Sequence, residues 1–425
     1  MPNNRTIEET VKTALKVENQ TMTEITDSRV GAILDDEGEL VTIPTVAESF
    51  RTCDLSFAYP PIEGFKTFRE RVTSWVLGPD LKVAKENHNL MTFSTVGGTT
   101  ALWLAFRFAQ IYGLEVLIPD LGRPCYTDLC NGAAAYFRKY AVLDRENRFN
   151  LEAISDIIQE DKNKFKGFLL LINDPCQNPT GHSLDEEESK ALFELISRTN
   201  RLGATRVALL WDTCYLSFTQ KRPAWLSLAA QANEAFTSLI AFSCSKNFAV
   251  YGMRVGLLLG ILPKGDETLQ DVLLNIFAKT VKQSYVVPDG LGMSALSYML
   301  ATERAKKIRT ELTPVVKILV ERGARMMAAL DEQQIDYIPY QEGFYLTAIC
   351  GANPDIVSDF LEQKKVFLYP IQPKYLRISI AALRPGQEKT IARAIKLAQA
   401  KTNDSEEIRK LRAIQAEQAA KRSHR

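Results

Sequence analysis

The sequence has few histidines and no paired cysteines, and both absences exclude kinds of site. The sequence has three histidines. Its seven cysteines are scattered and form no CxxC pair. A disulfide framework is typical of short secreted chains, and with only three histidines a His/Cys metal site is not expected. We therefore expect no metal, and we expect the cysteines to be buried small hydrophobic residues.

Neither charge is in excess, and no long apolar run is present. The 52 Lys and Arg against 51 Asp and Glu leave a net charge of +1, which excludes a polyelectrolyte surface for nucleic acid or an anionic membrane. No segment approaches the ~18 apolar residues of a membrane span, and MPNNRTIEET contains no apolar signal core. A cytoplasmic globular protein is expected.

Short apolar runs alternate with helix-length segments through the middle of the chain. Continuous apolar runs are typical of a parallel sheet covered on both faces. The clearest helix is predicted over Leu184–Leu202, with Ser183 and Glu186 as a capping box and Gly203 at its end. This alternation indicates the α/β class. The predicted strands are Val116–Pro119, Phe168–Ile172, Val207–Trp211, Leu239–Ser243 and Gly256–Ile261.

The two ends of the chain differ from the middle. The first 40 residues predict a helix over Ile7–Val17, an extended segment through Arg29–Gly31 and a turn at Asp35–Gly38. From about residue 316 a long amphipathic helix is predicted, followed by short strands around Gly343–Ala348 and Leu376–Ala381. This pattern indicates a second, smaller α+β domain. Residues 401–425 form a segment of mixed charge, and its composition is typical of a solvated helix or a frayed tail.

The most informative segment is Ser243–Gly256, with the sequence SCSKNFAVYGMRVG. It follows a buried strand, so Lys246 is predicted at the strand end where open α/β sheets bind their ligands. The hydroxyls of Ser243 and Ser245 and the guanidinium of Arg254 can hold a phosphate while the lysine amine reaches a group beside it. A phosphorylated cofactor captured as a Schiff base would use this arrangement. For an isolated lysine, a solvated surface position is the alternative.

This segment resembles the lysine motif of the fold-type I, class I pyridoxal phosphate aminotransferases, especially the aspartate and aromatic branch. The resemblance covers roughly residues 5–400, because other segments follow the order and approximate spacing of that branch. It implies a mostly parallel seven-stranded sheet with helices on both faces, plus a smaller α+β domain. The other segments are Arg29–Pro44, Tyr59–Gly64, Val96–Leu102, Asn178–Gly181, Asp212–Tyr215 and Tyr375–Ile378.

The resemblance also divides the chain into domains. It implies a large cofactor-binding domain over residues 41–315 and a small C-terminal domain over residues 316–400. The N-terminal segment, residues 1–40, would belong to the small domain. Residues 401–425 would then form a charged C-terminal extension.

The resemblance implies how this chain holds pyridoxal 5′-phosphate. Lys246 would form the Schiff base, and Asp212 would pair with the pyridinium nitrogen and keep the ring an electron sink. For an isolated Asp, a helix cap is the alternative. Tyr215 and Asn178 would donate to the ring oxygen. The phosphate would bind at the N-terminus of a helix through Ala101–Ile111, where backbone amides attract a dianion. Its ligands would be Gly98, Thr99, Ser243, Ser245 and Arg254.

Substrate-binding positions follow from the same resemblance. Arg377 lies in a short apolar strand and would clamp the substrate α-carboxylate with its planar fork, with a structural salt bridge as the alternative. Gly31 would close over the same carboxylate, and Asn178 would also border the substrate. Tyr59 would reach the phosphate of the neighbouring subunit, which implies a homodimer with shared sites; a core aromatic is the alternative.

Two positions depart from the pattern of that branch. The arginine that binds a side-chain carboxylate from the neighbouring subunit falls on Lys282, which either pairs as a point charge or points to solvent. The aromatic residue that stacks on the cofactor ring falls on Arg123, and the histidine that follows it is replaced by Tyr126. Either Arg123 or Tyr126 would cover the ring, and the sequence leaves both open.

The resemblance implies an aminotransferase that moves the amino group of aspartate, glutamate or an aromatic amino acid to a 2-oxo acid such as 2-oxoglutarate. The resemblance implies a pyridoxamine phosphate intermediate and ping-pong kinetics. A lyase or decarboxylase of the same fold is the alternative. A cofactor-binding regulator would carry a DNA-binding module, and the sequence shows no appended helix-turn-helix or strongly basic segment. The expected partners are small-molecule substrates and a second copy of the chain.

Overall fold

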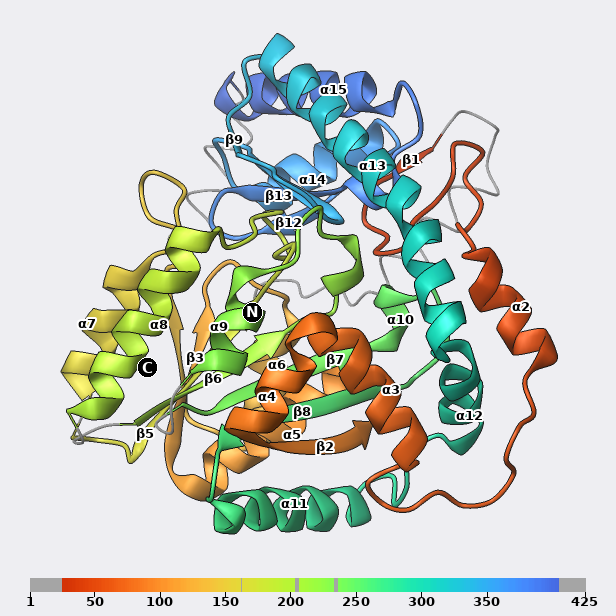
Figure 1. The fold of residues 1–425 in the computed structure, drawn as a ribbon. Coiled ribbons are helices and arrows are strands. Elements are labelled where there is room, and N and C mark those ends of the chain that lie inside the picture. The colour runs from red at the N-terminus through yellow and green to blue at the C-terminus, as the bar shows by residue number, and fades with distance from the viewer. Residues whose placement is uncertain (1–24, 162, 203–205, 233–235, 405–425) are drawn as a thin grey trace. The chain divides into compact units, whose positions relative to one another are not determined.

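The computed structural model describes residues 25–161, 163–202, 206–232 and 236–404. They form two compact units (Figure 1). The larger contains residues 40–321 and 341–345, and the smaller contains the described residues before 40, residues 322–340 and those from 346 onward. No helix in these ranges is long and apolar enough to cross a membrane. The helix predicted over Ile7–Val17, the helix end at Gly203 and residues 405–425 of the extension lie outside the described residues.

A seven-stranded sheet forms the centre of the larger unit. Its strands are β2 (His88–Thr95), β3 (Leu114–Pro119), β4 (Phe137–Tyr140), β5 (Gly167–Asn173), β6 (Arg206–Asp212), β7 (Ser238–Ser243) and β8 (Gly256–Pro263). They lie in the order β2-β8-β7-β6-β5-β3-β4. Neighbours pair in parallel, except that β8 runs antiparallel to β2 and β7. The five predicted strands and the mostly parallel sheet are confirmed, whereas β2 and β4 are strands that the apolar runs do not indicate.

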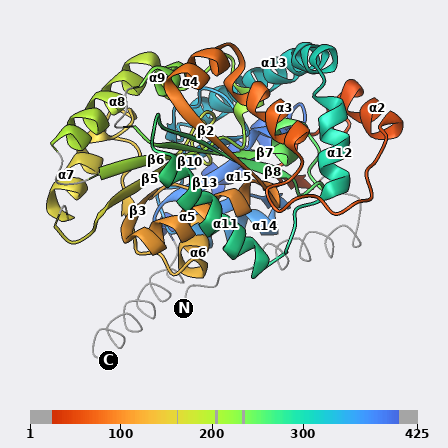
Figure 2. The ribbon, with the colours of Figure 1, turned by 60° about the horizontal axis from the view of Figure 1, so that its bottom comes forward.

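Helices cover both faces of this sheet (Figures 1 and 2). One face carries α5 (Gly97–Tyr112), α6 (Cys125–Gly132) and α11 (Glu267–Lys282), and the other carries α3 (Lys66–Leu77), α4 (Leu81–Asn87), α8 (Glu186–Arg201) and α9 (Ala224–Gln231). The remaining helical segments are α2 (Pro44–Thr52), η1 (Gly78–Asp80), α7 (Leu151–Asp161), η2 (Leu216–Phe218), α10 (Cys244–Asn247), α12 (Gly290–Met299) and the first part of α13 (Thr302–Glu332).

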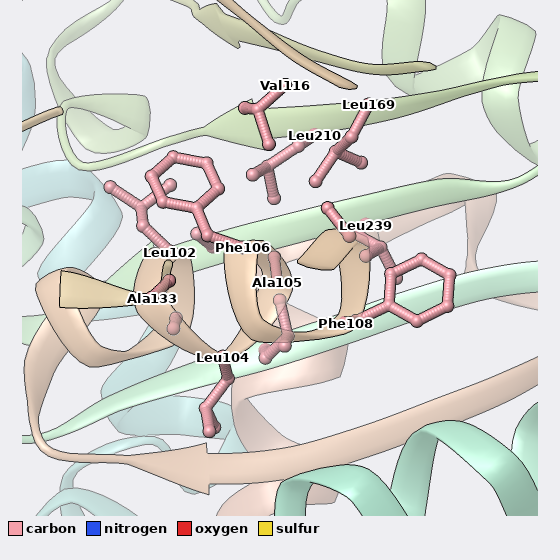
Figure 3. Packing of buried hydrophobic residues seen from close by; sticks show 14 of the residues in the cluster. Leu102, Leu104, Ala105, Phe106, Phe108, Val116, Ala133, Leu169, Leu210 and Leu239 are labelled. Carbon is pink, nitrogen blue, oxygen red and sulfur yellow. The ribbon is translucent and has the colours of Figure 1, made fainter. Parts of the chain in front are cut away.

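The core of the larger unit lies between α5 and the parallel strands (Figure 3). Side chains of α5 such as Leu102 and Phe106 are fully buried against residues of four strands. Each such side chain contributes roughly 1.5–3 kcal/mol when it leaves water. This packing fixes α5 and therefore holds its N-terminal glycines at the edge of the sheet. The strand residues are Val116, Leu169, Leu210 and Leu239.

The helix predicted over Leu184–Leu202 is α8, but its capping differs from the prediction. The N-cap is Asp185, whose side chain accepts a hydrogen bond from the backbone N–H of Glu188, and Glu188 accepts one from the Asp185 backbone in return. The expected cap, Ser183, lies two residues too early. Its hydroxyl instead donates to the carboxylate of Glu342, so a tertiary contact takes the place of the local one.

The smaller unit contains two small sheets. β9 (Tyr337–Ile338), β10 (Tyr345–Ile349), β12 (Tyr369–Ile371) and β13 (Tyr375–Ser379) form one, in the order β12-β13-β10-β9, and β1 (Thr26–Asp27) pairs with β11 (Val366–Phe367). Its helical segments are the last part of α13, α14 (Pro354–Gln363), η3 (Ile380–Ala382) and α15 (Gln387–Asp404). The two predicted strands correspond to β10 and β13. The long helix begins earlier than the predicted residue 316, because α13 continues through Pro314.

Candidate functional site

Three parallel strands end at the same edge of the large sheet, and the predicted cofactor-binding residues follow them. β6 ends at Asp212, and β7 ends at Ser243, directly before the short helix α10 that carries Lys246. β5 ends at Asn173, whose side-chain oxygen accepts a hydrogen bond from the backbone of Asn178. The carboxyl edge of an open α/β sheet is the usual place for a ligand.

Small residues and a guanidinium meet at the N-terminus of α5. Gly97 has a φ of +71°, and a Cβ there would lie 2.9 Å from Nη2 of Arg254. A Cβ at Gly98 would lie 2.9 Å from the Cβ of Ser243. Arg254 also donates from Nη1 to the Ser245 hydroxyl over 3.0 Å. Because the first-turn amides of a helix attract anions, we call this group the anion cup: Gly98, Thr99, Ser243, Ser245 and Arg254.

The carboxylate of Asp212 is fully buried and accepts hydrogen bonds on both oxygens. Oδ2 accepts from Nη1 of Arg123 at 2.7 Å and from the Tyr126 hydroxyl at 2.8 Å, and Oδ1 accepts from the Cys214 backbone at 3.2 Å. These contacts replace the helix-cap alternative. The two candidates for covering the cofactor ring, Arg123 and Tyr126, thus both extend to this carboxylate.

The pKa shifts of the two partners indicate which one is charged. Burial lowers the pKa of Arg123, but the adjacent Asp212 carboxylate and the smaller effects of Cys125, Cys214 and Tyr126 together raise it, and the pKa of Arg123 lies well above its ordinary value. Burial raises the pKa of the Tyr126 phenol well above its ordinary value, and the Asp212 carboxylate adds to that shift. Asp212 is therefore paired with one cation, Arg123, and one neutral donor, Tyr126.

Aromatic rings surround the amine of Lys246. Its Nζ lies 4.9 Å from the centroid of the Tyr251 ring and 6.0 Å from that of Phe344. Phe344 in turn packs against Tyr215, with the two centroids 4.9 Å apart. Asn178 donates from Nδ2 to the Tyr215 hydroxyl over 3.4 Å. Three predicted residues are thus brought together around a single phenylalanine.

Three further residues that the sequence does not predict belong to this site. Tyr251 and Phe344 border the lysine amine, and Asn247 joins the ends of β6 and β7 by donating from Nδ2 to the carbonyls of Thr213 and Ser243. Asn247 and Tyr251 lie in the lysine motif, which is the signal that could have indicated them. Phe344 lies far away in the sequence, and no local pattern points to it.

In the smaller unit, the N-terminal segment runs along β13. The Ser379 hydroxyl donates to the carbonyl of Val30 over 2.6 Å, and Nη2 of Arg377 donates to the carbonyl of Arg29 over 3.4 Å. These contacts place Gly31 directly after a segment that is bonded to the Arg377 strand. Gly31, the other residue predicted to bind the substrate carboxylate, thus follows two residues that are bonded to this strand.

A buried arginine fixes the same N-terminal segment. Arg322 is 1% exposed, and its Nη1 donates to the carbonyls of Leu34 and Ala381 at 2.8 and 3.0 Å. Its Nη2 forms an ion pair with Asp36 at 3.0 Å. The predicted turn at Asp35–Gly38 follows, closed by a hydrogen bond between its first and last residues. Arg322 thus ties the segment to η3, which directly follows β13.

Two predicted residues of the larger unit are not part of the Lys246 group. The side chain of Tyr59 is 91% exposed, next to Phe57 at 86%, so the core-aromatic alternative for Tyr59 is wrong. Lys282 is the exposed last residue of α11. Within the described ranges, no hydrogen bond or ion pair joins either side chain to the group around Lys246.

All seven cysteines are free thiols. Five are buried, as predicted, whereas Cys53 and Cys125 are half-buried. In the part of the chain that the structure describes, no group of three or more His, Cys, Asp or Glu side chains is placed to hold a metal ion.

Comparison with known proteins identifies the family. The family model for aminotransferase class I and II matches residues 24–395. The chain belongs to this family. Curated relatives of the aminotransferase include an aromatic-amino-acid aminotransferase of Paracoccus denitrificans, 24% identical over 79% of this chain and 82% of the relative. An aspartate aminotransferase of Pseudomonas aeruginosa is 23% identical over 86% of this chain and 90% of the relative.

Solved structures share the fold of the aminotransferase. One from Anaerococcus prevotii has a TM-score of 0.82 at 22% identity and covers 93% of this chain and 96% of its own. An aromatic-amino-acid aminotransferase from Burkholderia pseudomallei, covalently bound to pyridoxal phosphate, has a TM-score of 0.74 at 22% identity and covers 92% and 96%. The family depends on pyridoxal phosphate and transfers amino groups between amino acids and 2-oxo acids. The chain is therefore a transaminase, and the lyase or decarboxylase alternative is not favoured.

Proposed function

We propose that this aminotransferase takes an acidic or aromatic amino acid as donor and a 2-oxo acid such as 2-oxoglutarate as acceptor, with pyridoxal 5′-phosphate held by the larger unit. The proposal rests on one observation: an amine, a buried carboxylate, an amide–phenol pair and the anion cup meet at one edge of the sheet. The printed names of the relatives, aromatic-amino-acid and aspartate aminotransferases, support the substrate class.

The residues at this edge fit pyridoxal phosphate group by group. The anion cup suits the phosphate, because side chains are absent at Gly97 and Gly98 where backbone must approach closely. The carboxylate of Asp212 suits the ring nitrogen, and the Asn178–Tyr215 pair suits the ring oxygen. When bound, the cofactor supplies an electron sink for negative charge at the substrate Cα.

In this proposal the chain's own residues hold the cofactor and move one proton. Lys246 would hold the cofactor covalently, and its amine, once free, would take the proton from the substrate Cα. The rings of Tyr251 and Phe344 limit the contact of that amine with water. The Arg123 guanidinium pairs with the Asp212 carboxylate at 2.7 Å. A positioned proton carrier of this kind is worth roughly 10²–10⁴ in rate.

We assign the substrate α-carboxylate to Arg377 and Gly31 in the smaller unit. The Arg377 guanidinium is 9% exposed and is steadied by the Arg29 carbonyl. Its planar fork matches two carboxylate oxygens, and a charge-assisted pair of hydrogen bonds is about twice as strong as a neutral one. Arg322 keeps the neighbouring backbone in place.

We also propose that Lys282 binds the side-chain carboxylate of acidic substrates and swings away for aromatic ones. Lys282→Ala is then expected to lower kcat/KM for aspartate relative to phenylalanine by roughly 5- to 10-fold, because a point charge is lost that only the acidic donor uses. Steady-state kinetics with both donors measure this ratio. Lys279→Ala, an exposed lysine on the same helix, is the matched control. An unchanged ratio in the Lys282 variant would remove the assignment.

A homodimer with shared sites is part of the proposal. Tyr59 and Phe57 are almost fully exposed on one loop of the larger unit, which suits a surface that a second copy covers. Sedimentation equilibrium is expected to give about twice the 47.7 kDa chain mass, and Tyr59→Ala is expected to weaken cofactor binding. A monomer at enzyme-assay concentrations with full activity would contradict shared sites.

Initial velocities with both substrates test the proposed function. The two half-reactions use the same residues in turn, so double-reciprocal plots at several acceptor concentrations are expected to give parallel lines. Intersecting lines would mean that both substrates bind together, which a single Lys246 amine that serves both half-reactions in turn does not allow.

A further inference from the structure

We propose that Arg123 is the resident cation of Asp212: it neutralises the buried carboxylate, and it weakens the hold of that carboxylate on the cofactor's ring nitrogen. Arg123 is a positioning residue in this account, since it acts through Asp212. The ion pair is seen in the structure itself; only the effect on the cofactor rests on the proposed function.

The geometry of the pair supports a built contact. Nη1 of Arg123 lies 2.7 Å from Oδ2 of Asp212, and the two side chains are 21% and 1% exposed. The Tyr126 hydroxyl donates to the same oxygen at 2.8 Å. The guanidinium carbon lies 5.7 Å from the Tyr126 ring centroid. Arg123, from the loop before α6, and Tyr126, from the first turn of α6, therefore both donate to the same oxygen atom.

The loop that carries Arg123 is fixed on both sides. Gln177 donates from Nε2 to the carbonyl of Leu121 over 2.6 Å. A Cβ at Gly122 would lie 2.9 Å from Cγ of Pro119, so the loop packs closely at this point. The backbone N–H of Tyr126, in the first turn of α6, donates to the Arg123 carbonyl at 3.0 Å. The side chain thus leaves a rigid backbone in the direction of the carboxylate.

A carboxylate buried as deeply as that of Asp212 needs a counter-charge. An unpaired buried charge is strongly unfavourable, and removing one partner of a buried pair destabilises a protein far more than losing a surface pair. Tyr126 is neutral at ordinary pH, and the Cys214 backbone supplies only a dipole. Arg123 therefore supplies the counter-charge of the buried Asp212 carboxylate.

The same pair limits how strongly Asp212 binds a protonated ring nitrogen. A carboxylate with neutral donors and a pyridinium together carry no net charge, whereas the Arg123–Asp212 pair and a pyridinium carry one positive charge. The guanidinium repels the pyridinium at short range. Removing the guanidinium should therefore destabilise the empty protein and strengthen cofactor binding. An arginine that stacked on the cofactor ring would give the opposite change in cofactor affinity.

Two measurements on the full-length protein test this inference: the thermal midpoint after cofactor removal, and the dissociation constant for added pyridoxal 5′-phosphate. Arg123→Gln is expected to lower the cofactor-free midpoint by roughly 5–10 °C and to tighten cofactor binding by about tenfold. Arg123→Lys keeps the cation and is expected to change both values less. The exposed Arg198→Gln on α8 is the matched control.

The Asp212→Asn background separates the pair from general damage. There, adding Arg123→Gln is expected not to lower the cofactor-free midpoint further, because the carboxylate is already gone and no ion pair is lost. A cofactor-free midpoint unchanged by Arg123→Gln, or a weaker cofactor affinity, would overturn the inference. If the wild-type protein bound no pyridoxal phosphate, the proposed function and the cofactor half of the inference would both fail, while the midpoint would still report on the ion pair.

Discussion

Lys246→Ala is expected to lower kcat for transamination by at least about 10⁴-fold with every amino donor. The variant loses both the amine that holds the cofactor and the amine that carries the Cα proton, and the two losses act on the same reaction. No other described amine stands in the ring-lined position between Tyr251 and Phe344. The anion cup and Asp212 do not depend on this side chain, so cofactor binding without covalent attachment is expected to survive.

Borohydride treatment followed by mass spectrometry checks this prediction beside the rate. The wild-type chain should keep the cofactor mass on the peptide that contains Lys246, and the variant should not. Lys221→Ala, an exposed lysine in the same unit, is the control and should behave like wild type. A Lys246 variant with more than about a tenth of the wild-type rate would show that another group carries the chemistry.

Arg377→Ala is expected to lower kcat/KM for all amino donors by roughly 10²- to 10³-fold. The reason is the loss of a charge-assisted, two-pronged contact to the α-carboxylate that every donor shares. The kcat/KM of Arg377→Lys should fall between those of the wild type and Arg377→Ala, because an ammonium keeps the positive charge but not the planar pair of donors. Since the carboxylate is common to acidic and aromatic donors, the ratio of their efficiencies should stay the same.

Steady-state kinetics with aspartate and phenylalanine measure both effects. Arg393→Ala, an exposed arginine on α15 of the same unit, is the control. The midpoint of thermal unfolding checks that Arg377→Ala is folded, because the side chain also bonds to the N-terminal segment. A folded Arg377 variant with a normal kcat/KM would mean that the arginine is only structural, the alternative that the sequence leaves open.

The strands that the sequence predicts are those buried on both faces. β5 and β7 consist wholly of buried residues, and such runs are visible without any tertiary information. β2 lies at one edge of the sheet and mixes polar with apolar residues, and β4, at the other edge, is four residues long with two basic side chains. Edge strands lose the continuous apolar signal, so local patterns miss them.

Helix ends are set by contacts that the sequence does not display. Ser183 and Asp185 are both good N-caps, and the choice falls on Asp185 because the Ser183 hydroxyl is engaged by Glu342. Pro314 normally marks a helix boundary, yet it lies inside α13. The predicted start near residue 316 agrees with a helix that begins after this proline, whereas α13 begins at Thr302.

The site was predictable where a motif carries it and not where distant loops meet. Lys246, Arg254 and the hydroxyls between them share one segment, and the resemblance to known aminotransferases supplies their expected roles. The partner of Arg123 is 89 residues away in the chain. The sequence shows that Arg123 and Tyr126 replace familiar residues, but only the folded chain places both on the Asp212 carboxylate.

The amount of 2-oxo acid released from an amino acid alone tests the central claim most directly. Purified protein loaded with pyridoxal phosphate would be mixed with excess aspartate or phenylalanine, without any acceptor. Transamination predicts a single burst of about one 2-oxo acid per chain, followed by no further turnover until an acceptor is added. Continued release of product without an acceptor, or the formation of an amine and carbon dioxide, would contradict amino-group transfer.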